Sequence, residues 1–101
     1  MSSLRQSAKG MACLVRIPGV CSFDESTTVL AHIRCKNTGV GMKSHDLHGA
    51  YCCARCHDVL DGRVKQGNFS KTELSLMHLE GMVRTQLSML AHGYISINGR
   101  G

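Results

Sequence analysis

The stretch YCCARCHDVLD, residues 51–61, holds three cysteines and a histidine within the six positions from Cys52 to His57. Cys53 and Cys56 form a C-x₂-C unit, and two thiolates at this spacing can bind one metal ion from a tight turn. Such a pair can also act as a redox dithiol, and cysteines in general can form disulfides. Partners elsewhere in the chain decide between these readings, because a tetrahedral metal site needs two further ligands.

Cys13 and Cys21 are the cysteines that fit this need, since they flank a turn centred on Pro18-Gly19 in the segment CLVRIPGVC. We therefore predict a structural zinc site with four cysteine ligands, namely Cys13, Cys21, Cys53 and Cys56. Cys35 and Cys52 are left over, and we expect them to be small buried hydrophobic residues. The redox reading is weaker because the chain lacks the βαβ pattern in which that motif normally occurs.

The N-terminal segment favours a cytoplasmic protein. Arg5, Lys9 and Arg16 interrupt its apolar residues, so no stretch has the length of a signal peptide. No segment approaches the roughly 18 consecutive apolar residues of a membrane helix, so we expect no membrane contact. In the cytoplasm thiols stay reduced, and there a cysteine cluster more often binds metal than forms disulfides.

Length and composition predict a single domain over residues 1–101 that needs disulfides or a bound metal for its stability. The chain has two Phe, two Tyr and no Trp, so its core is poor in large side chains, and small domains of this kind often use a metal. Twelve Lys and Arg against seven Asp and Glu give a net charge of +5. This balance favours a polyanionic partner, with DNA first, although it also lies within the range of ordinary soluble domains.

The pattern of elements predicts an α+β fold. We expect a short helix within residues 2–10, a strand or turn around Pro18-Gly19, a strand over 28–35, a loop over 36–49, a short helix that begins near Ala54 and ends near Gly62, and a long helix over 70–92. Ser70 and Glu73 match a capping box at the start of the long helix. One apolar stripe follows that helix at steps of three and four residues: Leu76, Leu79, Val83, Leu87 and Leu90. We expect its two histidines, His78 and His92, to face solvent or cap the helix end without a chemical role.

The order of these features resembles the HNH nucleases of the His-Me finger group, whose typical string is a cysteine pair, DHI, a Gly-containing loop, NL and CxxCH. The corresponding residues here are Cys13 and Cys21, AHI (31–33), TGVGMK (38–43), DL (46–47) and CARCH (53–57). The chain also resembles a family of small prophage-encoded candidate nucleases. The motifs RIPGVC, LAHIR, CxxCHD and EGMxRTQ of that family occur at 16–21, 30–34, 53–58 and 80–86.

The resemblance implies a zinc-stabilised ββα-metal core over residues 13–60, with the long helix of 70–92 added to it. It implies that His32 is the general base that activates water. It further implies that Asp46, at the position of the middle Asn, orients that base, and that His57 is a ligand of a catalytic magnesium or manganese ion. The neighbouring cations Arg34, Lys36, Lys43 and Arg55 would then bind DNA phosphates.

Two departures from the pattern bear on activity. Ala31 replaces the Asp of DHI, which usually binds the catalytic metal, and Asp46 replaces the Asn. Either Asp46 supplies the missing oxygen ligand or the activity is reduced or lost. The sequence therefore predicts a metal-dependent DNA endonuclease and leaves two alternatives: a zinc-stapled nucleic-acid-binding module without activity, and a protein-interaction factor.

Overall fold

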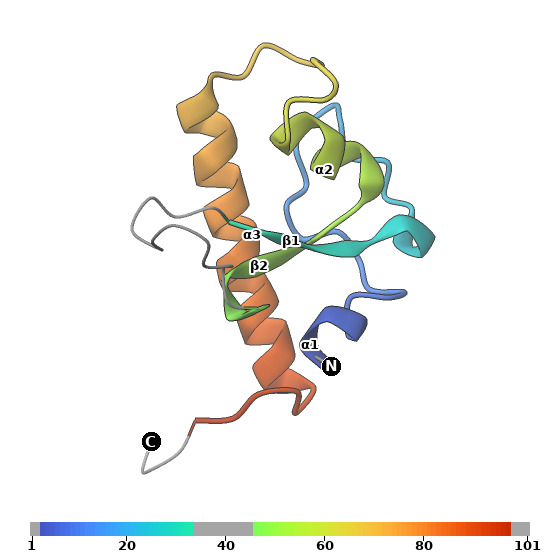
Figure 1. Cartoon of the computed structure of the whole chain (residues 1–101), viewed down its shortest axis with the longest axis vertical. Coiled ribbons are helices and arrows are strands. Elements are labelled where there is room, and N and C mark those ends of the chain that lie inside the picture. The colour runs from blue at the N-terminus through green and yellow to red at the C-terminus, as the bar shows by residue number, and fades with distance from the viewer. Residues whose placement is uncertain (1–2, 34–45, 98–101) are drawn as a thin grey trace, which may run out of the picture.

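A computed structural model describes residues 3–33 and 46–97. In chain order it contains α1 (Ser3–Gln6), the 3₁₀ turn η1 (Glu25–Thr27), β1 (Val29–His32), the 3₁₀ turn η3 (Asp46–His48), β2 (Gly49–Cys52), α2 (Ala54–Leu60) and α3 (Lys71–Ala91). Figure 1 shows that α3 runs along the length of the molecule, that the two strands cross it and that α2 lies beside it. The expected α+β class is confirmed. Among the described residues, no helix is long and apolar enough to cross a membrane.

The sheet has two antiparallel strands, β1 and β2, in which Leu30 pairs with Tyr51 and Ala31 with Ala50. β1 is shorter than the strand expected over 28–35, whose last two residues lie outside the described part. The expected loop over 36–49 included Gly49, and no element was predicted for residues 50–52; residues 49–52 form β2. All four residues of β2 are buried, so it lacks the alternation that marks a strand with one exposed face.

The long helix begins where the sequence predicts. Ser70 Oγ accepts a hydrogen bond from the Glu73 backbone N–H, and the Glu73 side chain accepts one from the Ser70 N–H, so both halves of the capping box form. These bonds satisfy two backbone donors that the first turn of a helix would otherwise leave unpaired. At the other end His92 is the C-cap, and Gly93 follows with a φ of +77° that favours glycine.

The helix packs on β2 through small residues. Gly81 touches the 14–15 backbone so closely that a Cβ there would lie 2.8 Å from Val15 Cγ2 and 3.0 Å from Val15 Cα. Thr85 is fully buried, donates a hydrogen bond from Oγ1 to the Gly81 carbonyl at 2.7 Å and accepts one from the Tyr51 N–H at 2.9 Å. The side chain of Thr85 therefore satisfies a β2 backbone donor that the strand pairing leaves open.

Two further residues of the EGMVRTQ segment hold α3 to the rest of the fold. Arg84 Nη1 donates to the Leu14 carbonyl at 2.7 Å, and Gln86 Nε2 donates to the Leu47 carbonyl at 2.6 Å. The motif thus has a docking role in this chain. The apolar stripe that the periodicity predicts lies on the other face of the helix: Leu76, Leu79, Val83 and Leu87 are exposed.

Candidate functional site

Four cysteines meet between the N-terminal segment and the start of α2. The sulfur atoms of Cys13, Cys21, Cys53 and Cys56 all lie within 4.8 Å of one another, and Cys21 Sγ is 3.8 Å from Cys53 Sγ. A tetrahedral zinc ion with Zn–S bonds of about 2.3 Å separates its sulfurs by about 3.8 Å, so the cluster fits such an ion. The four residues are those that the sequence predicts, and together they could hold a metal ion such as zinc.

Local turn chemistry sets each half of this cluster. Ile17 accepts backbone hydrogen bonds from Val20 and Cys21 at 3.0 Å, and Pro18-Gly19 fill the turn, with Gly19 at a φ of +73°. The segment therefore turns as predicted, and the alternative of a strand here is excluded. Cys53 is the N-cap of α2, and its sulfur accepts the Cys56 backbone N–H at 3.5 Å. An N–H···S bond of this kind stabilises a thiolate.

The thiols influence one another strongly. Side-chain hydrogen bonds from Cys52 and Cys56 hold the pKa of Cys13 far below its ordinary value, and the backbone N–H of Arg16 adds to this effect. Burial raises the pKa of Cys21 to about 11. The hydrogen bonds to Cys13 thus favour its thiolate form, whereas burial disfavours that of Cys21. Metal ligation uses the thiolate form of cysteine.

Cys52 lies beside the cluster without belonging to it. It is fully buried at the end of β2, and a hydrogen bond to Cys13 raises its pKa. The expectation that Cys52 is a buried, non-ligating residue agrees with this position. Cys35, the other cysteine left over, lies outside the described residues.

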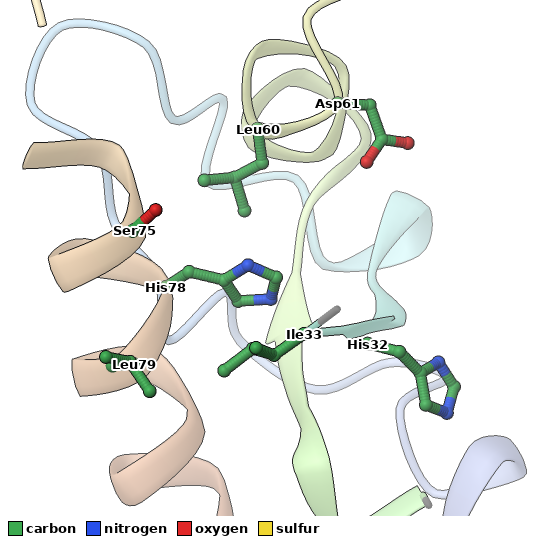
Figure 2. A pocket seen from close by; sticks show the side chains of 7 residues that line it. All are labelled: His32, Ile33, Leu60, Asp61, Ser75, His78 and Leu79. Atoms are coloured by element: carbon green, nitrogen blue, oxygen red, sulfur yellow. The ribbon is translucent and has the colours of Figure 1, made fainter. Parts of the chain in front are cut away.

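A pocket of about 500 Å³ opens between α3, the end of β1 and the end of α2. Figure 2 shows its titratable side chains: His78 reaches from α3 toward the strands, Asp61 stands at the end of α2, and His32 extends from the end of β1 with its ring directed away from His78. The remaining lining residues are Ile33, Leu60, Ser75 and Leu79. The pocket thus combines two imidazoles and a carboxylate on partly apolar walls.

His32 and Asp46 are joined directly. His32 Nε2 lies 2.7 Å from Asp46 Oδ1, and the two side chains are partly buried. Arg5 approaches the same carboxylate oxygen at 3.7 Å. The sequence predicts that Asp46 acts with His32, and the structure brings the two together. Nothing in the sequence pointed to Arg5, which comes from the distant α1.

His57 contacts a residue that the sequence analysis did not single out. His57 Nε2 lies 3.3 Å from Asp61 Oδ2, one helical turn later, and Asp61 in turn lines the pocket. The i,i+4 spacing on a helix could have indicated this pair. Arg63 also binds Asp61 Oδ2, at 2.6 Å. His57 is therefore linked through Asp61 to the pocket that His32 also lines.

The expectation that His78 faces solvent or caps the helix end is wrong. His78 is partly buried, and its Nε2 lies 2.8 Å from the carbonyl oxygen of Ala31. Because a carbonyl only accepts, Nε2 carries the proton and Nδ1 is left as an acceptor. Burial lowers the pKa of His78, the Ala31 bond partly opposes this, and the nearby His57 and His32 lower it as well. His92 is exposed and stacks on Tyr94, as expected for a helix-end residue.

Ala31 has a structural place of its own. Its side chain is 2 % exposed and belongs to the same core cluster as Cys13, Cys53 and Cys56. An aspartate here would be buried among apolar and sulfur atoms, so position 31 of this fold does not present a metal ligand to the pocket. What Ala31 contributes is its carbonyl, which orients His78.

Of the cations expected to bind phosphates, Arg55 is exposed on α2. Arg34, Lys36 and Lys43 lie outside the described residues. Arg5, which contacts Asp46, and Arg63, which contacts Asp61, add positive charge near the pocket. Arg5 reaches the site only through the tertiary fold, whereas Arg63 follows Asp61 by two residues in the chain.

Known proteins resemble this chain over nearly its whole length. A family model described as "Putative nuclease YbcO" matches residues 2–94. Two curated proteins with the same description, one from Escherichia coli K12 and one from Enterobacteria phage 82, are each 43% identical over 98 residues. Each match covers 94% of this chain and 98% of the relative.

A solved structure shares the architecture. It is described as a "putative bacteriophage protein" of Escherichia coli K-12, and it superposes with a TM-score of 0.76 at 41% identity. The match covers 90% of this chain and all of that one. One of the two curated relatives comes from a phage, and the solved structure is described as a bacteriophage protein.

Proposed function

Because the chain belongs to the YbcO family of candidate nucleases, we propose that it is a metal-dependent endonuclease that hydrolyses DNA phosphodiester bonds. The observation that carries the proposal is the hydrogen bond between His32 and Asp46 beside a pocket that also contains His78 and Asp61. The succession of two antiparallel strands, α2 and a four-cysteine cluster supports the HNH-like reading of the fold.

His32 is the proposed general base. An ionised Asp46 accepts the hydrogen bond from Nε2–H of His32, which leaves Nδ1 with a lone pair to take a proton from water. A carboxylate that fixes the tautomer and direction of an imidazole in this way is a common device for general-base catalysis. The water would then attack phosphorus in line with the leaving oxygen.

Asp61 and His57 are the proposed ligands of a divalent cation, magnesium or manganese. Such an ion would neutralise charge on the phosphate and on the leaving oxygen. Among the described residues, the four cysteines are the group whose ligand atoms lie within 4.8 Å, so the pocket does not offer a complete cage. Magnesium is often bound by one or two carboxylates together with substrate phosphates, and Asp61 fits that mode.

The four-cysteine site has a separate task in this proposal. The cluster joins the 13–21 turn, the end of β2 and the first turn of α2. A zinc ion bound there would fix α2, and with it His57 and Asp61, relative to the strand that ends at His32. Catalytic groups need such rigid support to be positioned well.

The second candidate is a zinc-stapled DNA-binding module without activity. The burial of Ala31 favours it, because no carboxylate stands beside His32 at the position where HNH nucleases carry their aspartate. The exposed Arg55 and the net charge of +5 would serve DNA binding in either case.

A plasmid-nicking assay separates the two candidates. The protein is incubated with supercoiled DNA and magnesium or manganese, with a chelator-treated reaction as reference, and His32→Ala is compared with His92→Ala. His92 stacks on Tyr94 and does not line the pocket, so its loss controls for removal of a histidine. We expect wild type and His92→Ala to nick DNA and His32→Ala to lose roughly 10²-fold or more in rate. If wild type leaves the plasmid intact with every divalent metal, the nuclease proposal gives way to the binding module.

A further inference from the structure

The outer face of α3 is apolar and exposed. Of the outer stripe, defined as Leu76, Leu79, Val83, Leu87 and Leu90, the first four side chains are 55%, 44%, 52% and 61% exposed, and Leu90 is partly buried. Single exposed leucines are ordinary, but a contiguous apolar row along a helix marks an interaction site. The helix packs on β2 through another face, which carries the buried residues Gly81, Thr85 and Met89. The helix has 21 residues and is thus about 32 Å long at 1.5 Å per residue.

The outer stripe reads the same in both directions. Leu79 and Leu87 lie four residues before and after Val83, and Leu76 and Leu90 lie seven residues before and after it. When two such helices pack antiparallel about a twofold axis through Val83, each apolar residue of one stripe therefore lies opposite an apolar residue of the other. Leu79 then meets Leu87 of the second copy, and Val83 meets its own equivalent. Interfaces in twofold dimers need this self-complementarity, in which residue i contacts j and j contacts i.

Two charges on one edge of the stripe select the same arrangement. Glu80 and Arg84 are both exposed, are one helical turn apart and lie on the same side of the stripe. In the antiparallel pair, the edge of one helix that carries Glu80 and Arg84 lies beside the same edge of the second helix. Glu80, three residues before Val83, then lies two steps, or about 3 Å along the axis, from Arg84 of the second copy. The ion pair forms twice by symmetry.

A parallel pair would not use these charges. In a parallel pair, the helix edge that carries Glu80 lies beside the opposite edge of the second helix. That opposite edge carries the uncharged residues Met82 and Gln86. Arg84 also donates one N–H to the Leu14 carbonyl, but a guanidinium has five donors and can serve both partners.

We propose that a second copy of this chain docks antiparallel on the outer stripe of α3 and forms a twofold dimer. The inference is independent of the proposed nuclease activity. Specific interfaces bury about 1,200–2,000 Å² in total, and one pair of helix faces supplies little more than the lower part of that range. We therefore expect a reversible dimer with a dissociation constant on the order of 1 µM.

The test is sedimentation equilibrium of the zinc-loaded full chain over a wide range of protein concentration. Val83→Glu places two like charges on the axis, and we expect it to weaken the dimer by roughly 10²-fold or more. Val83 is the best position because Leu79 also lines the pocket. Asn68→Glu adds the same charge at an exposed site before α3 and is the matched control. Far-UV circular dichroism verifies that both variants keep their helix content.

Charge reversal tests the direction of packing. Glu80→Arg alone should weaken the dimer, and Glu80→Arg with Arg84→Glu should restore most of the affinity, because each ion pair re-forms with its signs exchanged. A purely structural effect of either change would not be restored by the other. A monomer at every concentration, or a dimer that Val83→Glu does not weaken, overturns the proposal. Failure of the double variant to recover affinity overturns the antiparallel packing.

Discussion

His32 Nε2 lies 2.7 Å from Asp46 Oδ1, so the end of β1 and a 3₁₀ turn fourteen residues later share one hydrogen bond. Arg5, from the N-terminal helix, approaches the same oxygen at 3.7 Å. The carboxylate thus has two cationic or hydrogen-donating neighbours, which suits a residue that orients an imidazole. We propose this role for Asp46 in preference to the role of a metal ligand.

Asp46→Ala tests this assignment. Loss of the carboxylate frees the His32 ring, and we expect a fall of roughly 10²-fold in DNA cleavage, the lower end of what a positioned general base contributes. Asp46→Asn keeps an oxygen that can accept the same bond and should retain most of the activity. Zinc content should be unchanged in both variants. A metal requirement that rises on Asp46→Ala would instead indicate that Asp46 binds the cation.

Removal of the metal should unfold the domain. Structural zinc contributes on the order of 10 kcal/mol of apparent folding free energy in small domains. We expect one zinc per chain by elemental analysis and loss of the cooperative thermal transition after chelation. Cys53→Ser should lose both the zinc and the transition. Cys52→Ser is the matched control, because Cys52 is equally buried yet outside the four-sulfur set, and zinc should remain bound. Protein without zinc that melts normally would contradict the assignment.

The buried hydroxyl of Thr85 should stabilise the fold through its hydrogen bonds more than through its packing. Thr85→Val keeps the shape but leaves the Tyr51 N–H without an acceptor, which costs about 1–3 kcal/mol in free energy of unfolding. Thr85→Ser keeps the hydroxyl and loses only a methyl group, so it should cost less. Urea denaturation of the three proteins measures the difference. Equal stability of the Val and Ser variants would show that the hydrogen bond is not the main contribution.

Gly81→Ala should lower the stability of the protein, although replacement of glycine by alanine usually stabilises a helix. In an exposed helix interior this change stabilises by about 1 kcal/mol. Here the new Cβ would lie 2.8 Å from Val15 Cγ2 and 3.0 Å from Val15 Cα, so α3 must move away from the 14–15 segment. We expect net destabilisation, by about 1–3 kcal/mol as for other overpacked sites. A melting temperature above that of wild type would show that the contact relaxes freely.

Acid should destabilise the fold partly through His78. Burial lowers its pKa in the folded state, so the unfolded chain binds more protons once the pH falls below the ordinary histidine value of about 6.5. The contribution of His78 to stability is therefore present above that pH and is lost progressively as the pH falls through it. His78→Gln, which can still donate to the Ala31 carbonyl, should flatten the dependence of unfolding free energy on pH between 7 and 5. An unchanged slope would assign the dependence to other groups.

The sequence by itself determined the parts of this protein that depend on a few neighbouring residues. The Ser70–Glu73 capping box, the turn at Pro18-Gly19 and the start of a short helix near Ala54 follow from local hydrogen bonds, and the structure contains all three. The four-cysteine set also came from spacing and context, because thiols of this pattern have few alternative uses in a reduced compartment.

The tertiary structure alone decided which face of α3 is buried and what surrounds the pocket. The helix has apolar residues on two sides, so periodicity could not choose between them. The choice depends on Gly81 fitting against Val15 and on Thr85 binding the Tyr51 N–H, and both contacts join residues far apart in the chain. Once that face is docked, His78 is turned toward Ala31 and the outer stripe remains in solvent. Long-range packing of this kind leaves no signal in a single helix, because its cause is the shape of the surface that the helix meets.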